Sequence, residues 1–438
     1  MKADGELPAL DRRHVWHPFT QAATAPEPIP IRSASGARLI AADGSEYLDL
    51  ISSWWVTLHG HAHPAIATAI ARQAAQLEQV IFAGFTHEPA VQLAARVSAL
   101  LPDGLERVFY SDDGSTSVEI ALKLACQYWH NKGEPKRHRF LAFEGGYHGD
   151  TFGAMSVGRS SGFYKPFHDL LFAVDLLPYP ETWDGDADVE RKEAASIALL
   201  DGWIERHGGE AVALIMEPLV QGASGMRMCR PEFVRAIAGR LKAAGILFIL
   251  DEVMTGFGRT GGTFACLKAG VAPDLICLSK GLTGGFLPLA ATVCRQEIYQ
   301  AFLGGDFDRA FAHGHSFTAN PLGCAAALAS LDLLLAPETA TRLTMIEGVH
   351  RERLVRLTHH PRLTRPRVCG TIGAVTIGGS EQGYNAALGN RLKAFFLERG
   401  LLIRPLGPVI YLLPPFCVSS EELHRAYDAI EEAAATVS

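Results

Sequence analysis

The stretch Gly245-Ile-Leu-Phe-Ile-Leu-Asp-Glu-Val253, with the later Pro273-Asp-Leu-Ile-Cys-Leu-Ser-Lys-Gly281, decides the fold. Each segment holds a continuous apolar run of strand length, 246–250 and 275–278, which is typical of strands buried on both faces of a parallel sheet. The first run ends at Asp251 and the second, past Ser279, at Lys280. Ligands of open α/β sheets bind outside the carboxyl ends of the strands. We therefore predict that Asp251 and Lys280 face one site.

A carboxylate and a lysine at one site indicate a specific chemistry. A lysine with little water around it has a lowered pKa and can form a Schiff base with a carbonyl compound. A carboxylate beside a heteroaromatic nitrogen keeps that nitrogen protonated. These are the two main contributions that a protein makes to pyridoxal phosphate. The alternative is a surface lysine and an acid that pairs with a neighbour, because ion pairs are common.

The length and composition indicate a large folded chain. Its 438 residues are 48% hydrophobic, enough for two or three domains and unlike a disordered chain. The net charge of −7 argues against nucleic acid or an anionic membrane as the main partner. The eight cysteines include no CxxC pair, the first residues lack a signal-peptide pattern, and no apolar run approaches the roughly 18 residues of a membrane span. We therefore expect a cytoplasmic protein with free thiols.

The order of predicted elements divides the chain into two kinds of structure. Strands alternate with helices from about residue 105 to 295, which predicts an α/β fold with a mostly parallel sheet. From about residue 335, long helices and short strands indicate a smaller α+β domain. Three segments are predicted: an N-terminal arm and hairpin, 1–60, that belongs to the small domain; a large domain, 61–335; and a C-terminal small domain, 336–438. Local patterns also predict helices over 64–80 and 385–399 and a hairpin of strands at 401–405 and 409–413.

A turn of small residues between a predicted strand and a helix forms a candidate anion site. The strand 107–110 is followed by Ser-Asp-Asp-Gly-Ser-Thr-Ser and then by a helix predicted from Val118 to Trp129. Free backbone N–H groups, hydroxyls and the helix dipole favour an anion at such a place. Gly114, Ser115 and Thr116 are predicted to hold a phosphate. The alternative is a simple helix cap at Ser115 or Ser117.

Aromatic and histidine residues supply further candidates. Tyr147, in Glu144-Gly-Gly-Tyr-His-Gly-Asp150, is placed to lie against a flat ring, and the adjacent Trp54 and Trp55 point in different directions, with core packing as the alternative. The alternating histidines invite a metal reading, but no adjacent cysteine or carboxylate completes a set of ligands, so we expect no metal site. These histidines are His59, His61 and His63.

These motifs resemble the class III, or ω-, aminotransferases of pyridoxal-phosphate fold type I, over nearly the whole chain. The family pattern is a strand, Asp-Glu, a Gly-Arg-Thr-Gly turn, and then Ser-Lys-Gly. Other motifs resemble the branch of the family that serves biotin synthesis. They are Trp16-His-Pro-Phe-Thr20, Ser52-Ser-Trp-Trp55, Gly146-Tyr-His-Gly-Asp-Thr-Phe-Gly-Ala-Met-Ser156, Gly225-Met-Arg-Met228, Ile403-Arg-Pro405 and Ile410-Tyr-Leu412. The resemblance implies a homodimer that binds pyridoxal phosphate at the subunit interface.

The resemblance also implies a role for individual residues. Lys280 would carry the internal aldimine and Asp251 would pair with the pyridine nitrogen. The cofactor contacts would be completed by Gly114, Ser115, Tyr147 and His315, with Ser316 supplied by the partner chain. The substrate pocket would be lined by Phe19, Trp54, Trp55, Tyr147 and Gly314, and Arg404 would bind the carboxylate of the keto acid.

The implied reaction is a ping-pong amino transfer from S-adenosylmethionine to 7-keto-8-aminopelargonate, which gives 7,8-diaminopelargonate. Lysine is the alternative donor. Phe19 stands where members that use S-adenosylmethionine often have tyrosine, and His315 precedes Ser316 where some members have proline before threonine. A second alternative is another aminotransferase of ω-amino acids or diamines.

Two alternatives come from other classes of protein. Gly256-Phe-Gly-Arg-Thr-Gly261 fits the G-x-G-x-x-G pattern of nicotinamide enzymes, but it does not directly follow a strand, and Gly262-Thr-Phe264 follows it rather than a helix. A binding module that has kept the fold without the chemistry is the second alternative. The presence of every expected catalytic residue argues against it.

Overall fold

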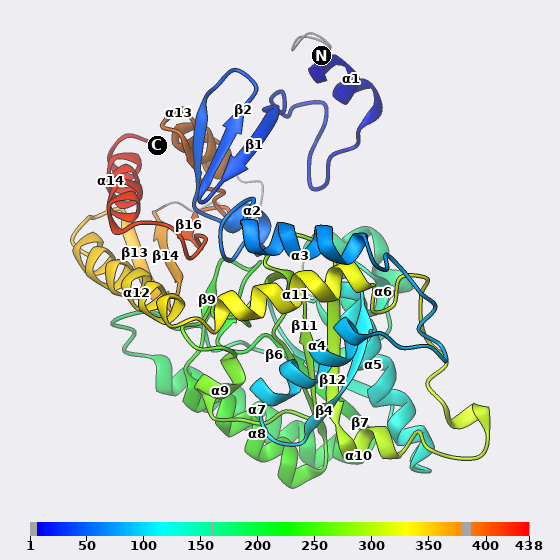
Figure 1. Ribbon diagram of the computed structural model, residues 1–438. Helices are drawn as coiled ribbons and strands as arrows, with labels where there is room; N and C mark the ends of the chain where they lie inside the picture. The colour runs from blue at the N-terminus through cyan, green and yellow to red at the C-terminus, as the bar shows by residue number, and fades with distance from the viewer. Residues whose placement is uncertain (1–6, 160–161, 379–386, 438) are drawn as a thin grey trace.

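A seven-stranded sheet forms the centre of the larger part of the molecule (Figure 1). The computed structural model describes residues 7–159, 162–378 and 387–437. The strand order is β4-β12-β11-β10-β7-β5-β6, and only β12 runs antiparallel to its neighbours. The strands are β4 (Leu105–Ser111), β5 (Arg139–Phe143), β6 (Val174–Leu177), β7 (Ala211–Met216), β10 (Leu247–Asp251), β11 (Leu275–Leu278) and β12 (Ala290–Arg295). The predicted α/β fold with a mostly parallel sheet is confirmed.

Helices cover both faces of this sheet because the side chains of each strand alternate between the faces. In β10, Leu247 and Ile249 pack into a core that α5 (Gly114–Asn131) completes. Phe248 and Leu250 belong to a second core, shared with α7 (Val189–His207) and α8 (Pro231–Ala244). Every residue of β10 and β11 is buried, as the two continuous apolar runs predict.

Two smaller sheets lie beside the large one, in the upper left of Figure 1. One has the order β1-β2-β3-β15, so the N-terminal hairpin pairs with a strand from near the C-terminus; the other has the order β13-β14-β16. The strands are β1 (Ile31–Ser35), β2 (Arg38–Ala41), β3 (Glu46–Asp49), β13 (Leu363–Cys369), β14 (Ile372–Ile377), β15 (Leu401–Leu402) and β16 (Val409–Leu412), with β8 (Val220–Gln221) and β9 (Arg227–Met228) forming a separate pair. The boundaries of the three predicted segments stay a prediction.

The remaining elements are mostly helices. They are α1 (Leu7–His14), α2 (Ser52–Trp55), α3 (Pro64–Ala74), α4 (Glu88–Leu100), α6 (Phe152–Val157), α9 (Ala265–Ala269), α10 (Gln296–Gln300), α11 (Pro321–Leu334), α12 (Pro337–Leu357), α13 (Ala387–Glu398) and α14 (Ser420–Thr436), with short 3₁₀ turns at η1 (Gly162–Leu170), η2 (Gly208–Glu210), η3 (Lys280–Thr283) and η4 (Phe307–Arg309). In the part of the chain that the structure describes, no single helix passes a length and hydropathy test for a membrane span; the pair α11 and α12, bent by 71°, passes only when joined.

Two local predictions are wrong. The segments 401–405 and 409–413 do not form a hairpin, because β15 pairs with β3 whereas β16 pairs with β14. Pro405 has no backbone N–H to donate to a neighbouring strand. The helix predicted over 64–80 ends at Ala74, because the residues beyond it bury no apolar face. The predicted start of α13 at residue 385 lies outside the described residues.

Candidate active site

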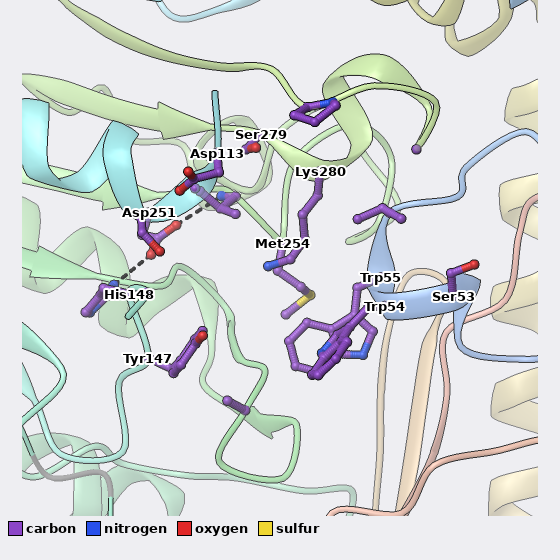
Figure 2. Close-up of a pocket in the computed structure, with 18 of the residues that line it drawn as sticks. Ser53, Trp54, Trp55, Asp113, Tyr147, His148, Asp251, Met254, Ser279 and Lys280 are labelled. Atoms are coloured by element: carbon purple, nitrogen blue, oxygen red, sulfur yellow. Dashed lines mark hydrogen bonds and ion pairs between the residues drawn. The ribbon is translucent and has the colours of Figure 1, made fainter. Parts of the chain in front are cut away.

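A cavity of about 570 Å³ opens at the carboxyl ends of the parallel strands (Figure 2). Four neighbouring strands each lead to one ionisable side chain that lines it. β5 leads to His148, β7 to Glu217, β10 to Asp251 and β11 to Lys280. Met216 is paired with Leu250 in the sheet, so Glu217 and Asp251 follow the last paired residues of adjacent strands. In the parallel pair of β10 and β11, Asp251 is paired with Cys277, three residues before Lys280, so this register brings Asp251 and Lys280 to the same edge of the sheet.

Lys280 extends into this cavity between Asp251 and the two tryptophans (Figure 2). Burial lowers the pKa of its amine, and the negative charges of Asp251 and Glu217 only partly oppose that shift. Its Nζ lies 5.2 Å from the centroid of the Trp55 ring. Its φ of 44° lies in the left-handed region, an uncommon conformation that costs on the order of 1–3 kcal/mol and is concentrated at functional sites. A buried amine with a lowered pKa is a competent nucleophile.

Asp251 is fixed by two hydrogen bonds. Its Oδ2 accepts the Nδ1–H of His148 at 2.7 Å, and its Oδ1 accepts the backbone N–H of Val253 at 3.0 Å. Burial lowers the pKa of His148, but the hydrogen bond and charge of Asp251 outweigh burial and leave that pKa above its ordinary value. The imidazole and the backbone N–H therefore hold the carboxylate in a fixed position at the cavity.

The predicted phosphate site lies where α5 begins. The helix starts at Gly114, four residues before the predicted Val118. Its N-cap is Asp113, whose Oδ1 accepts the Thr116 N–H at 3.0 Å, while the Thr116 hydroxyl accepts the Asp113 N–H at 3.2 Å. The alternative of a cap at Ser115 or Ser117 is therefore wrong.

The cap leaves the serine side chain of the first turn available near the cavity. Gly114 and Ser115 line the cavity, whereas Thr116 does not. The Ser115 hydroxyl accepts the backbone N–H of Asp150 at 3.1 Å. A Cβ on Gly149, whose φ is +123°, would lie 2.1 Å from Ser115 Oγ, so the loop after β5 packs against the helix start at a distance that only glycine allows. The two segments form a narrow cradle at a helix N-terminus, which suits a phosphate.

Aromatic side chains form the opposite wall. The rings of Phe19 and Trp54 meet edge to face with centroids 5.6 Å apart, and the Arg404 guanidinium carbon lies 4.3 Å from the centroid of the Trp54 ring. Trp55 is buried, and its Nε1–H donates to the hydroxyl of Tyr411 at 2.9 Å. Segments from both ends of the chain thus meet at one wall with a single guanidinium beside it.

Tyr147 closes another side of the cavity. Its hydroxyl donates to the carboxylate of Asp150 at 2.9 Å, and its backbone N–H donates to Glu217 at 3.0 Å. Hydrogen bonds of the backbone and of the hydroxyl thus fix Tyr147, with its ring in the position expected for stacking on a flat ligand.

Besides Thr116, three predicted residues do not line this cavity. Gly314, His315 and Ser316 lie on the loop before α11; the Nδ1 of His315 is 3.2 Å from the carboxylate of Asp112, which does line the cavity. The carbonyl oxygen of Ser316 accepts the side-chain N–H of Gln79 at 2.6 Å. The assignment of Ser316 to the partner's site, and the cofactor contact of His315, stay predictions.

Two of the three alternating histidines are hydrogen-bonded to other groups, and the ring of His63 packs edge to face against that of His59. The Nε2 of His59 lies 3.1 Å from the Ser330 hydroxyl, and the Nε2 of His61 lies 2.9 Å from the Asp49 carboxylate. Over the described ranges, no group of three or more His, Cys, Asp or Glu side chains is placed to hold a metal ion.

The G-x-G-x-x-G segment 256–261 also lies away from the cavity. It forms a turn whose Arg259 is buried and donates to the carbonyl oxygens of Pro414 at 2.7 Å and Thr57 at 3.1 Å. The segment thus ties the large sheet to the chain termini and does not form a strand-to-helix nucleotide loop.

His148 and Glu217 were not predicted as site residues. Glu217 follows the strand 211–216 in the same way that Asp251 follows its own strand, and that parallel position is the signal that would have found it. His148 is the neighbour of Tyr147, but its contact with Asp251 depends on two segments 103 residues apart.

The site fits pyridoxal phosphate. The cradle at α5 suits the phosphate, Asp251 a protonated ring nitrogen, Tyr147 the ring face, and the Lys280 amine the aldehyde. All of these groups surround one cavity (Figure 2).

Comparisons with known proteins agree with this chemistry. The family model described as "Aminotransferase class-III" matches residues 20–434. An adenosylmethionine-8-amino-7-oxononanoate aminotransferase of Synechococcus elongatus is 57% identical over 96% of this chain and 98% of its own length. The crystal structure of an enzyme of the same name from Methanocaldococcus jannaschii is 34% identical, with a TM-score of 0.92 over 99% of this chain and 100% of that one.

A third similar protein was solved with the cofactor. It is an amine transaminase from an uncultivated Pseudomonas species in the PLP-bound (internal aldimine) form, 32% identical, with a TM-score of 0.89 over 97% of this chain and 99% of that one. Since the family model and these full-length relatives agree with the geometry of the cavity, the chain belongs to the class-III aminotransferases and is a pyridoxal-phosphate-dependent aminotransferase.

Proposed function

We propose that this enzyme transfers an amino group from S-adenosylmethionine to 8-amino-7-oxononanoate, also called 7-keto-8-aminopelargonate, and so forms 7,8-diaminopelargonate for biotin synthesis. The name of the Synechococcus relative at 57% identity supports this proposal. The observation that carries it is the single guanidinium of Arg404 against the Trp54 ring, because a long aliphatic keto acid needs apolar walls for its chain and one cation for its carboxylate.

Each residue of the site has a proposed role. Bound pyridoxal phosphate supplies the carbonyl that takes up the amino group and a ring that withdraws electrons. Gly114 and Ser115 hold the phosphate, and Asp251 keeps the ring nitrogen protonated. The amine of Lys280 would hold the cofactor at rest and, when free, would move a proton between the donor carbon and the cofactor. The keto acid then runs the same steps in reverse, a ping-pong cycle.

The assembly and compartment are part of the same proposal. A homodimer is supported by the loop of Gly314, His315 and Ser316, which the family resemblance assigns partly to the partner's site, and by large exposed apolar side chains such as Trp16 (92% exposed) and Phe85 (63%). A cytoplasmic location is supported by the eight cysteines, all of which are free thiols, as a reducing compartment requires.

The choice of donor depends on the aromatic wall. Aromatic faces attract a sulfonium cation, which favours S-adenosylmethionine. Phe19 lies edge-on to Trp54 and is 37% exposed at the cavity, but it has no hydroxyl to orient a polar donor. Lysine is therefore the second candidate donor.

The direct test is to incubate the purified holoenzyme with 8-amino-7-oxononanoate and each donor and to measure 7,8-diaminopelargonate. We expect product with S-adenosylmethionine. We also expect Phe19→Tyr to raise turnover with S-adenosylmethionine and not with lysine, because a hydroxyl is added where the donor binds. Phe307→Tyr, at a 77% exposed ring that does not line the cavity, is the control. If lysine bleaches the cofactor band in a single turnover and S-adenosylmethionine does not, the donor assignment is wrong, although the product assignment survives.

A further inference from the structure

Two buried carboxylates, not one, line the cavity, and the roles described above use only Asp251. The second is Glu217, which is 5% exposed and stands at the end of β7, the strand next to β10. A buried carboxylate usually has a cationic partner, because burying a charge without compensation costs several kcal/mol. Glu217 has no ion pair among the described residues.

Both oxygens of Glu217 are held by the backbone instead. Its Oε2 accepts the N–H of Tyr147 at 3.0 Å, and its Oε1 accepts the N–H of Gly222 at 3.0 Å. Gly222 belongs to a tight contact, since a Cβ there would lie 3.0 Å from both Met254 and Trp55, two residues that line the cavity. The carboxylate is thus fixed between the loop that carries Tyr147 and the turn beside the aromatic wall.

The charge of Glu217 acts on the reacting groups. Burial raises its pKa to about 7, an effect that the charge of His148 opposes and that of Asp251 reinforces. The same carboxylate raises the pKa of Lys280, where burial acts in the opposite sense. In a low-dielectric cavity such charges interact strongly. The titratable groups that interact with the Glu217 carboxylate are His148, Asp251, Lys280, Tyr147, Tyr164 and Tyr179. Burial raises the pKa of all three tyrosines, so their hydroxyls stay protonated.

We propose that Glu217 is a positioning residue for amino transfer, whose negative charge, set beside Asp251 by the register of β7 and β10, holds the proton on the linkage between Lys280 and the cofactor. The inference rests on the proposed role of Lys280. Both carboxylates line the same cavity as Lys280, and the charge of each raises the pKa of its amine. The two backbone hydrogen bonds keep the charge in place while the Lys280 side chain moves during the reaction.

Glu252 provides a matched control within the same chain. It is fully buried, its two oxygens accept the backbone N–H groups of Ala265 at 2.6 Å and Cys266 at 2.7 Å, and burial raises its pKa to about 7 as well. It does not line the cavity. Glu252→Gln therefore removes a buried carboxylate of the same kind that lies outside the cavity lining.

The test is a pH titration of the visible absorbance of the holoenzyme. We expect the midpoint to fall by about one pH unit in Glu217→Gln, the shift that loss of one nearby opposite charge produces, and to stay unchanged in Glu252→Gln. Glu217→Asp keeps the charge, so its midpoint should lie close to that of the wild type. If Glu217→Gln does not fold, Glu217→Met gives the same readout, because it removes the charge at similar length.

Two outcomes overturn the proposal, and they can be told apart. Borohydride reduction followed by peptide mass spectrometry locates the residue that carries the cofactor. If the cofactor is on Lys280 and the midpoint of the neutral variant equals that of the wild type, Glu217 has no such role. If the cofactor is on another lysine, the proposed role of Lys280 fails and this inference fails with it, whatever the midpoints are.

Discussion

At the scale of single residues, the site depends on side chains whose backbone is in an uncommon conformation. The backbone φ angles of Lys280, Trp55 and Phe19 are 44°, 67° and 49°. All three lie in the left-handed region, which residues other than glycine rarely adopt. Strain of this kind persists only where the surroundings impose it. Here it turns one amine and two aromatic rings into the same cavity.

The first prediction concerns Lys280. Lys280→Ala should abolish turnover, because the attachment of the cofactor and the proton transfer are both lost. The variant should still bind pyridoxal phosphate weakly through the cradle at Gly114 and Ser115. Turnover assays and equilibrium dialysis measure the two effects. Near-normal turnover in this variant would refute the assignment.

The second prediction concerns Arg404. Arg404→Ala should lower kcat/KM for the keto acid by about one to two orders of magnitude, because a hydrogen bond to a charged group contributes roughly 1.5–3 kcal/mol. The donor half-reaction should change less. Arg399→Ala, which removes an ion pair with Glu432 far from the cavity lining, is the control. An unchanged kcat/KM for the keto acid places the carboxylate site elsewhere.

At the scale of elements, binding of the phosphate depends on how the loop after β5 meets the start of α5. The capping box of Asp113 and Thr116 caps the N-terminus of α5 without using the Ser115 side chain. Gly149 then allows the loop to contact the Ser115 side chain. The helix start is therefore stable by itself, while its function as a cradle depends on the loop.

We expect Gly149→Ala to weaken binding of pyridoxal phosphate by roughly tenfold or more, since the added Cβ displaces Ser115. Binding of pyridoxal, which lacks the phosphate, should change much less. Gly133→Ala is the control, because its φ of +80° is also positive but nothing lies within 4 Å of the added atom. Equal losses for both ligands would mean that the cavity as a whole is disturbed.

At the scale of the whole molecule, buried polar groups join separate elements of the region after residue 335. His350 on α12 is fully buried; its Nε2–H donates to the Thr371 carbonyl at 3.1 Å, so its Nδ1 accepts the Tyr427 hydroxyl at 2.7 Å. Burial lowers its pKa to about 4. The unfolded chain binds a proton here below pH 6.5, whereas the folded chain does not until about pH 4, so stability is lost as the pH falls through this window.

His350→Gln should reduce that acid sensitivity. The variant is expected to be less stable than the wild type at pH 7, but its free energy of unfolding should fall less between pH 6.5 and 4, by up to about 3 kcal/mol. Urea titrations at several pH values measure the slope. His14→Gln, at an exposed position of α1, should leave the slope unchanged. Equal slopes for the wild type and His350→Gln would show that the buried imidazole titrates normally.

The sequence by itself determined the central sheet and the pair of residues at its carboxyl edge. The runs 246–250 and 275–278 are apolar throughout, and a parallel register brings the residues after them to one edge, so Asp251 and Lys280 were predictable from local pattern alone. The capping box of α14 at Ser419 and Glu422 was predictable for the same reason, because its hydrogen bonds join residues three apart.

Only the tertiary structure decided the remainder. The pairing of β15 with β3, the contact of His148 with Asp251, and the wall of Phe19, Trp54 and Arg404 join segments far apart in the chain. Local hydrogen bonding and periodicity carry information about neighbours three or four residues away, whereas these contacts depend on how whole elements pack. The function of Glu217 belongs to this second group, because its charge matters only where the register places it beside Asp251.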